Sequence, residues 1–362
     1  MATSQRFRMT RTTSALAGTA VLAAALVTVS SAVPASAAKP GNGSSTGTGL
    51  VFKVNPVQSS GNQALTDMKD SDAAVPLDEY ASVRLKNLDG SGFLQGKWVS
   101  IKSSTGAPAY SRTNTFSYLR HADQFEQVMA YFWVDRAQGY LQSLGFGSTL
   151  PPANMQQQAV RVDQYGVDNS FFNDARHFDI RFGKGGVDDA EDAEVIVHEY
   201  GHAVHNAQVP GFGSTLDSGS IGESFGDYLA VTVGLDAAQE FGWPVKAEQA
   251  CPMDWDATSY TKAPHCIRRF DTNLTVATRE GEVHDDGQIW SQALWEVRGD
   301  YVGLGLTTRA WDTTLIDSQF RYAPDTSFSA AAKQTYLTAL QRDGQAAADA
   351  VKKRFEERGI IL

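Results

Sequence analysis

The chain has 362 residues, which is enough for one large domain or for two lobes that share a substantial core. Its composition, with 42% hydrophobic, 10% aromatic and 20% charged residues, is that of an ordinary globular protein. The 41 acidic residues outnumber the 31 Lys and Arg, and the resulting charge of −10 argues against nucleic acid as a partner.

The first 37 residues have the features of a secretory signal peptide. Three arginines without an acidic residue come first, an Ala/Leu/Val-rich stretch follows over 16–29, and small residues end the segment at 35–37. A transmembrane anchor is the alternative, but the apolar stretch is short and is broken by polar residues. Cleavage would remove three of the 31 basic residues and none of the 41 acidic ones, so the charge would change from −10 to −13. We therefore expect a secreted, extracellular protein without stable membrane association.

The remaining chain divides into a strand-rich part and a helix-rich part. Residues 39–49 form a Gly/Ser/Thr-rich flexible leader, and short β-rich runs follow over 50–54, 81–85 and 97–102. Apolar residues at helical spacing predict a helix over 121–144, and strand-like runs return at 159–165 and 177–182. Further helices are predicted over 190–207, 222–233, 287–297, 307–319, 329–342 and 345–358.

Strands followed by helices predict an α+β fold with two lobes, the first β-rich and the second mainly helical. We expect a signal peptide over 1–37, a leader and β-rich region over 38–118, an N-terminal lobe over 119–208 and a helical C-terminal lobe over 209–362. A monomer is the expected oligomeric state.

The sequence HEYGH at residues 198–202 is the strongest chemical signal in the chain. On a helix, His198 and His202 are four residues apart and leave the same face, so both can bind one zinc ion. Glu199 points about 100° away from them, toward a metal-bound water rather than toward the metal. The alternative is a chance match in which both histidines only pack or cap a helix. Asp188, followed by Glu191, predicts the start of this helix.

Glu223 and Asp227 lie one turn apart on the next predicted helix and are candidates to complete the site. A catalytic zinc needs a third protein ligand and an open position, and Glu223 fits that role. Asp227 is placed to accept the N–H of a ligand imidazole. The alternative for Glu223 is a solvated charge at the start of a helix.

HEYGH and four segments around it resemble the glutamate-zincin metallopeptidases, the relatives of thermolysin and fungalysin, and are most similar to the bacterial fungalysin-like branch. Before HEYGH lie NSFF at 169–172 and FGKGGVDD at 182–189. After it lie GESFGD at 222–227 and EVHDDGQIWS at 282–291. The resemblance implies a two-lobe thermolysin-like fold with the HExxH helix in the cleft. It also implies that Asn169 and Ser170 bind an extended peptide at an edge strand and that His284 stabilises the transition state.

The chain departs from the family pattern at several positions. Arg279 occupies the position of the aspartate that orients the transition-state histidine, which leaves Glu280 or Glu282 for that role. Gly213 stands where a tyrosine is expected, and Gly222 where an asparagine would support His202. Arg268 and Arg269 are both candidates for the arginine that contacts the substrate carbonyl.

Two further expectations concern stability. Cys251 and Cys266 are the only cysteines, and in an exported protein they are expected to form a disulfide that closes a surface loop. Calcium is a second possible cofactor, because a cluster of acidic residues before the HEYGH segment could bind it. We prefer helix capping as the role of this cluster, which consists of Asp188, Asp189, Glu191, Asp192 and Glu194.

Together these patterns predict a secreted zinc metalloendopeptidase that acts on polypeptides. Its zinc ligands would be His198, His202 and Glu223, its general base Glu199, and its oxyanion donor His284. The alternative is a zinc-bearing extracellular binding or adhesion protein without turnover, although such a protein would have no need of Glu199.

Overall fold

A computed structural model describes residues 45–103, 105–174 and 178–362 of the chain. The predicted signal peptide over 1–37 and most of the leader lie outside the described residues. Within the described residues, no helix is both long and apolar enough to cross a membrane.

The N-terminal part contains two small sheets. In the first, β1 (Gly47–Phe52) is central, antiparallel to β2 (Tyr80–Leu85) and parallel to β4 (Thr115–Phe116). In the second, the order is β3 (Val99–Ile101), β5 (Gln158–Arg161), β7 (Asp179–Arg181) and β6 (Phe171–Asn173). β6 is an edge strand and pairs antiparallel with β7, so its other side is not occupied by a described strand.

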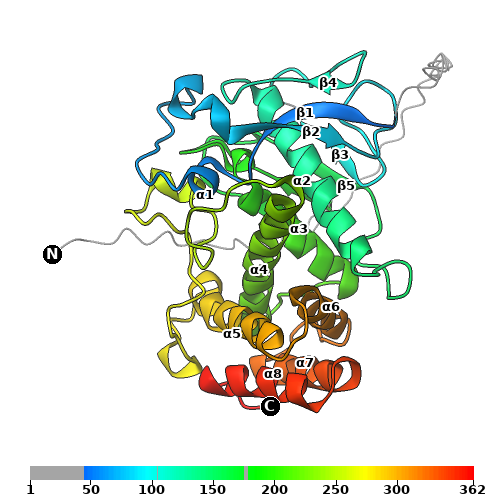
Figure 1. Ribbon diagram of the computed structural model, residues 1–362, viewed down its shortest axis with the longest axis vertical. Coiled ribbons are helices and arrows are strands. Elements are labelled where there is room, and N and C mark those ends of the chain that lie inside the picture. The colour runs from blue at the N-terminus through cyan, green and yellow to red at the C-terminus, as the bar shows by residue number, and fades with distance from the viewer. Residues whose placement is uncertain (1–44, 104, 175–177) are drawn as a thin grey trace, which may run out of the picture. The chain divides into compact units, whose positions relative to one another are not determined.

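Helix α2 (Asp123–Ser143) packs against both sheets and supplies much of their common core (Figure 1). Its side chains are buried on nearly every face, because β1 and β3 cover one part of it and α3 another. Fully buried members include Phe125, Val128, Met129, Trp133 and Leu141. Burial on this scale contributes about 1.5–3 kcal/mol for each large apolar side chain.

Helices α3 (Ala193–Gln208) and α4 (Leu216–Phe241) pack against each other next to α2 (Figure 1). The Asp192 side chain accepts a hydrogen bond from the backbone N–H of Glu194 and thereby caps α3. The prediction that Asp188 starts this helix is therefore wrong, because a short 3₁₀ helix, η3 (Asp189–Glu191), precedes α3. Helix α4 extends beyond the predicted 222–233 at both ends. It begins at a capping box formed by Thr215 and Ser218, within a segment whose composition is poor in apolar residues.

The C-terminal part consists of α5 (Val283–Gly303), α6 (Thr308–Gln319), α7 (Phe328–Arg342) and α8 (Gln345–Glu357). α5 packs on α4, and α8 packs on α5 and α7 (Figure 1). Three of these helices match their predicted bounds to within one residue, whereas α5 begins four residues before the predicted 287. Its early start is caused by Glu282, whose carboxylate accepts the backbone N–H groups of His284 and Asp285. The predicted α+β class, with sheets first and helices afterwards, is confirmed.

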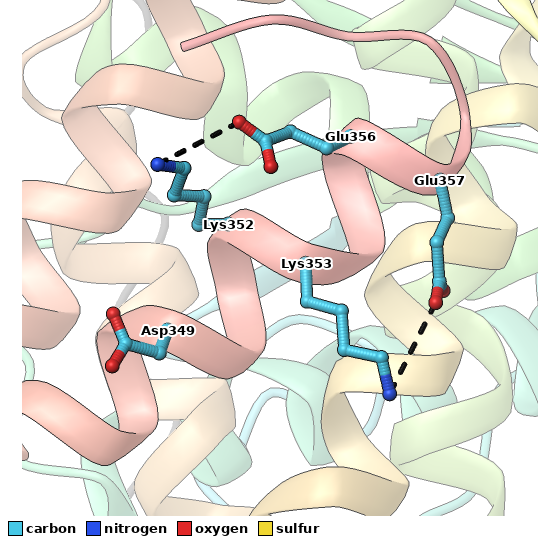
Figure 2. Close-up of a pocket in the computed structure, with 5 residues that line it drawn as sticks. All are labelled: Asp349, Lys352, Lys353, Glu356 and Glu357. Atoms are coloured by element: carbon cyan, nitrogen blue, oxygen red, sulfur yellow. Dashed lines mark ion pairs between the residues drawn. The ribbon is translucent and has the colours of Figure 1, made fainter.

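A surface hollow on α8 carries charged side chains only (Figure 2). Lys352 pairs with Glu356 at 3.7 Å, and Lys353 pairs with Glu357 at 4.0 Å, each one helical turn apart. Exposed pairs of this kind stabilise a helix by about 0.3–0.5 kcal/mol each. The hollow is a solvated helix face and contains none of the residues of the HExxH segment.

Candidate metal centre

His198 and His202 project from one face of α3 toward α4. Their Nε2 atoms lie 3.1 Å apart, as the spacing of one helical turn predicts. The two helices come into backbone contact beside them: a Cβ added at Gly201 would lie 2.9 Å from the Cα of Gly226. Because both positions are glycine, α4 can approach α3 closely enough for its side chains to reach the two imidazoles.

Glu223 of α4 brings its carboxylate to both histidines. Its Oε2 lies 3.3 Å from Nε2 of His198, and its Oε1 lies 3.5 Å from Nε2 of His202. Tetrahedral zinc with bonds of about 2.0–2.2 Å places its ligand atoms about 3.3–3.6 Å apart. The observed separations therefore fit a zinc site formed by these three residues, whose potential ligand atoms all lie within 4.8 Å of one another.

The environment of Glu223 supports a ligand rather than a solvated charge. Helix α4 begins at Leu216, so Glu223 does not lie at the helix start, and its side chain is only 14% exposed. Its Oε2 is buried without a hydrogen-bond partner among the described residues. Burial would raise the pKa of this carboxyl, but His202 and His284 hold it well below its usual range. The group is thus kept ionised, as a metal ligand must be.

Asp227 fixes the orientation of His198 through the ring nitrogen that faces away from Glu223 and His202. Its Oδ1 lies 2.8 Å from Nδ1 of His198, which leaves Nε2 of that ring facing Glu223 and His202. Arg268 in turn donates to both oxygens of Asp227, at 2.6 and 2.5 Å. Burial raises the pKa of Asp227, but the charge of Arg268 outweighs burial and lowers it. Carboxylate support of this kind is typical of metal-binding histidines.

Burial and the neighbouring carboxylates shift the pKa values of the two imidazoles in opposite directions. Burial lowers the pKa of His198, but hydrogen bonds to Asp227 and Glu223 raise it to about 10. For His202, burial dominates and lowers the pKa to about 4, so this ring is neutral at pH 7. Nδ1 of His202 has no hydrogen-bond partner among the described residues, in line with Gly222 at the position where the family has an asparagine.

Glu199 lies beside the three ligands but is not one of them. Its side chain is buried, and its Oε2 has no hydrogen-bond partner in the described part of the chain. Burial raises the pKa of this carboxyl to about 7, while the charge of His198 acts in the opposite direction. A carboxylate with a pKa near neutrality is well suited to accept and return a proton.

His284 reaches the cluster from the first turn of α5. Its Nε2 lies 3.3 Å from Oε2 of Glu223, and its Nδ1 lies 2.7 Å from Oε1 of Glu282. Glu282 therefore orients the imidazole, a choice that the sequence left open between Glu280 and Glu282. The helix predicted over 287–297 would leave His284 in the preceding loop, but α5 begins at Val283 and includes it. Arg279, one of the departures from the family pattern, pairs instead with Asp217 at 2.8 Å.

The structure also separates the two candidate arginines. Arg268 lies at the site, with a guanidinium nitrogen 3.4 Å from Nδ1 of His198 and its side chain 10% exposed. Arg269 points elsewhere and pairs with Asp271 and Glu248.

Asn169 and Ser170 immediately precede the edge strand β6. The Ser170 hydroxyl donates to a carboxylate oxygen of Asp189, so its side chain already has a partner. The backbone carbonyl of Asn169 accepts the N–H of Gly183 at 3.2 Å. Their contact with substrate stays a prediction.

The loop after α4 is closed by the predicted disulfide between Cys251 and Cys266. The predicted acidic cluster before α3 has divided roles. Glu191 pairs with Arg120, Asp192 caps α3, and Glu194 accepts the backbone N–H of Met253.

Comparisons with known proteins agree with this geometry. Residues 182–319 match the family model of the fungalysin metallopeptidases (M36). The chain is 29% identical over 126 residues to extracellular metalloproteinase 9 of Uncinocarpus reesii (strain UAMH 1704), which covers 29% of this chain and 18% of that protein. It is 30% identical over 115 residues to extracellular metalloproteinase 2 of Trichophyton tonsurans, with coverage of 29% and 18%.

The match to the family model of the fungalysin metallopeptidases is confined to residues 182–319. This segment includes α3, α4 and the first turn of α5, and so contains every residue of the metal cluster. The predicted resemblance is thereby confirmed. The chain nevertheless spans only about a fifth of the length of the curated relatives that it matches. Among solved structures, the precursor of protealysin from Serratia proteamaculans is 18% identical and covers 72% of this chain and 86% of its own, with a TM-score of 0.49.

Proposed function

We propose that this protein is a secreted zinc endopeptidase that hydrolyses polypeptides, with zinc held by His198, His202 and Glu223. One observation carries the proposal: three ligand atoms converge at separations of 3.1–3.5 Å, and a fourth buried group, the Glu199 carboxylate, lies beside them with its Oε2 unpartnered among the described residues. A purely structural zinc site would be expected to use a fourth protein ligand and would have no use for a free carboxylate.

Zinc, when bound, would polarise the scissile carbonyl and lower the pKa of a water molecule. Glu199 accepts the proton of the attacking water and passes it to the leaving amine. His284, held by Glu282, donates a hydrogen bond to the oxyanion through Nε2. Asp227 and Arg268 keep the His198 ring in place, and Arg268 is also our proposal for the side chain that meets the substrate carbonyl.

The substrate would lie extended along the free side of β6, next to Asn169 and Ser170. An edge strand offers unpaired backbone N–H and C=O groups. These groups can bind the backbone of a peptide whatever its sequence, which suits an enzyme that cleaves polypeptides. We further propose a monomer, cleavage of a signal peptide near Ala37, and two lobes over 119–208 and 209–362. The named relatives are extracellular metalloproteinases, which supports secretion.

The deciding experiment is a Glu199→Gln variant compared with wild type and with Glu248→Gln. Glu248 is an exposed glutamate outside the cluster, so the second variant controls for the substitution itself. We expect Glu199→Gln to keep its zinc but to lose a factor of about 10²–10⁴ in casein hydrolysis, because the water loses its proton acceptor. Glu248→Gln should retain activity, and chelation should abolish activity in both wild type and control.

The rival interpretation, a zinc-bearing adhesion or binding protein, makes the opposite prediction. Wild-type protein with one bound zinc and no chelator-sensitive hydrolysis of casein or gelatin would support that rival. N-terminal sequencing of the exported protein tests the signal peptide separately.

A further inference from the structure

The segment over residues 279–282 leads into α5 and carries Glu282, the carboxylate that orients the proposed oxyanion donor. Glu280, Gly281 and Glu282 are exposed, and a Cβ added at Gly281 would meet no atom within 4 Å. The backbone N–H groups of Glu280 and Gly281 donate to the carboxylate of Asp286, at 2.8 and 3.2 Å. Because the exposed part of the segment buries little surface, its position depends on how its two ends are held.

Arg279 holds the first end of this segment against two helices. Its Nη1 atom lies 2.8 Å from Oδ1 of Asp217, which belongs to the first turn of α4. Its guanidinium carbon lies 4.2 Å from the ring centroid of Phe328, the first residue of α7. The other oxygen of Asp217 accepts the backbone N–H of Phe328 at 2.9 Å, so the three residues are joined to one another. We name this group the Arg279 clamp.

The Arg279 clamp lies partly out of solvent. The side chains of Arg279 and Asp217 are each 23% exposed, and Phe328 is 2% exposed. An ion pair and a cation–π contact that share one guanidinium restrict it more than either contact alone, and partial burial strengthens both. The backbone at residue 279 is therefore fixed relative to α4 and α7.

The same part of α4 presents Glu223, one of the three proposed zinc ligands. Glu223 follows Asp217 on this helix. The first turn of α5 packs closely on the stretch between them, since a Cβ added at Gly219 would lie 2.8 Å from Cγ1 of Val283. The exposed segment is thus attached at both ends to the part of α4 that carries the zinc ligand.

We propose that Arg279 is a positioning residue for His284. By fixing the start of the exposed segment, it keeps Oε1 of Glu282 at 2.7 Å from Nδ1 of His284. With Nδ1 held in this way, Nε2 is presented to the oxyanion at a constant position, as a preorganised donor requires. Arg279 acts through Glu282 and is not itself a catalytic residue. The inference rests on the proposed function, because it assigns this task within the same reaction.

Two variants and a matched control test the inference. Arg279→Met removes the charge and keeps a long apolar side chain, whereas Arg279→Lys keeps a positive charge. Arg342→Met is the control. Arg342 is 29% exposed, and it pairs with Asp317 at 3.2 Å, which joins α7 to α6 rather than to the segment before α5. Each protein is assayed at full length and loaded with zinc, with an internally quenched peptide as substrate.

Arg279→Met should lower kcat about three- to fivefold and leave KM and zinc content unchanged, because only the orientation of the oxyanion donor is affected. Arg279→Lys should lose less than about twofold, and Arg342→Met should match wild type. In a Glu282→Ala background, Arg279→Met should have less than about a 1.5-fold further effect, because the group through which it acts is absent. A merely structural role would give the same loss in both backgrounds.

Hydrogen exchange measured by mass spectrometry provides a readout that needs no peptidase activity. The backbone N–H groups at 280, 281, 284 and 285 donate to the carboxylates of Asp286 and Glu282. These amides should exchange at least about threefold faster in Arg279→Met than in wild type, and no faster in Arg342→Met. If wild type proves inactive, the proposed function fails, while the exchange rates still decide whether Arg279 holds the segment.

Several outcomes would overturn the inference. Unchanged kcat or unchanged exchange in Arg279→Met would show that the segment is held without the clamp. Loss of zinc from this variant would place the effect on the metal rather than on His284. An equal fall of kcat in Arg342→Met, or an undiminished effect of Arg279→Met in the Glu282→Ala background, would reduce the role of Arg279 to general stability.

Discussion

The zinc cluster and the three-aspartate site, a group formed by the carboxylates of Asp168, Asp189 and Asp256, use the same kind of side chain in opposite ways. In the zinc cluster, the carboxylates that face away from the metal position are paired: Asp227 with His198 and Arg268, and Glu282 with His284. In the three-aspartate site, Asp189 and Asp256 are buried, and the Oδ1 atom of each has no hydrogen-bond partner in the described part of the chain. The first site is held in place by its hydrogen-bonded partners, whereas in the second burial raises the pKa values of Asp189 and Asp256 well above their usual range.

The two sites also differ in the elements that build them. The zinc ligands come from two helices whose spacing is fixed by helix geometry, so their arrangement exists before any metal binds. The aspartates come from a loop segment and two short 3₁₀ helices, so their arrangement depends on the path of the chain between distant segments. The predictions below test whether the two sites are independent in this way.

The largest expected effect is loss of zinc from Glu223→Ala. This variant removes a ligand, whereas Asp227→Asn removes only the partner of His198 and should weaken zinc binding about 10–100-fold. Competition with a chromogenic chelator measures both affinities. Asp168→Asn is the control and should bind zinc like wild type. If Glu223→Ala retains wild-type affinity, another residue completes the site; if Asp168→Asn loses zinc, the two sites are not independent.

A smaller effect is expected at His284, which is argued to act on the transition state rather than on the metal. His284→Ala should lower kcat about 10²–10³-fold, or about 2.7–4 kcal/mol, with zinc content and KM little changed. Glu282→Gln should lower kcat by no more than about fivefold, because the pair is half exposed and such pairs contribute about 0.2–1 kcal/mol. Loss of metal from His284→Ala would instead make this histidine a ligand.

The disulfide offers a way to disturb one site more than the other. Cys251 and Cys266 close a loop that carries Asp256, and Arg268 lies just outside it. The Cys251→Ser/Cys266→Ser double variant should lose about 3 kcal/mol of stability, as expected for a closed loop of this length. Chemical denaturation measures this loss. Zinc affinity should change little, because the three proposed ligands lie on α3 and α4, outside this loop; a large fall would contradict the proposed independence.

The parts of the molecule that were predictable are those set by short sequence separations. The spacing within residues 198–202 and between Glu223 and Asp227 is a property of one helical turn, so it could be read before the fold was known. The α+β order and most helix bounds follow from the same periodicity. Caps were harder: Asp188 and Asp192 are equally plausible in sequence, and only the path of the chain through η3 makes Asp192 the cap of α3.

What could not be predicted depends on contacts between distant segments. The choice between Arg268 and Arg269 depends on which one faces α4, and the three-aspartate site requires three loops to meet. Glu282 was one of two candidates to orient His284, and the early start of α5 decides between them. The close approach at Gly201 and Gly226 was missed as well, since a glycine inside a helical pattern does not reveal what lies against it.

The smallest predicted effect concerns Gly226, and it tests whether the zinc cluster is preformed by helix packing. A Cβ at this position would lie 2.6 Å from Nδ1 of His198, too close for either group to remain where it is. Gly226→Ala should therefore displace the ring from Asp227 and destabilise the protein by about 1–3 kcal/mol, as overpacking typically does. Zinc affinity should fall with it, measured by the same chelator competition.

Gly299 in α5 is the matched control for this substitution. A Cβ there would meet no atom within 4 Å, so Gly299→Ala should stabilise the protein by up to about 1 kcal/mol through helix propensity alone. The two variants make the same chemical change on helices and are expected to shift the free energy of unfolding in opposite directions. If Gly226→Ala also stabilises the protein and keeps its zinc, the helices can separate without loss, and packing at Gly226 does not position His198.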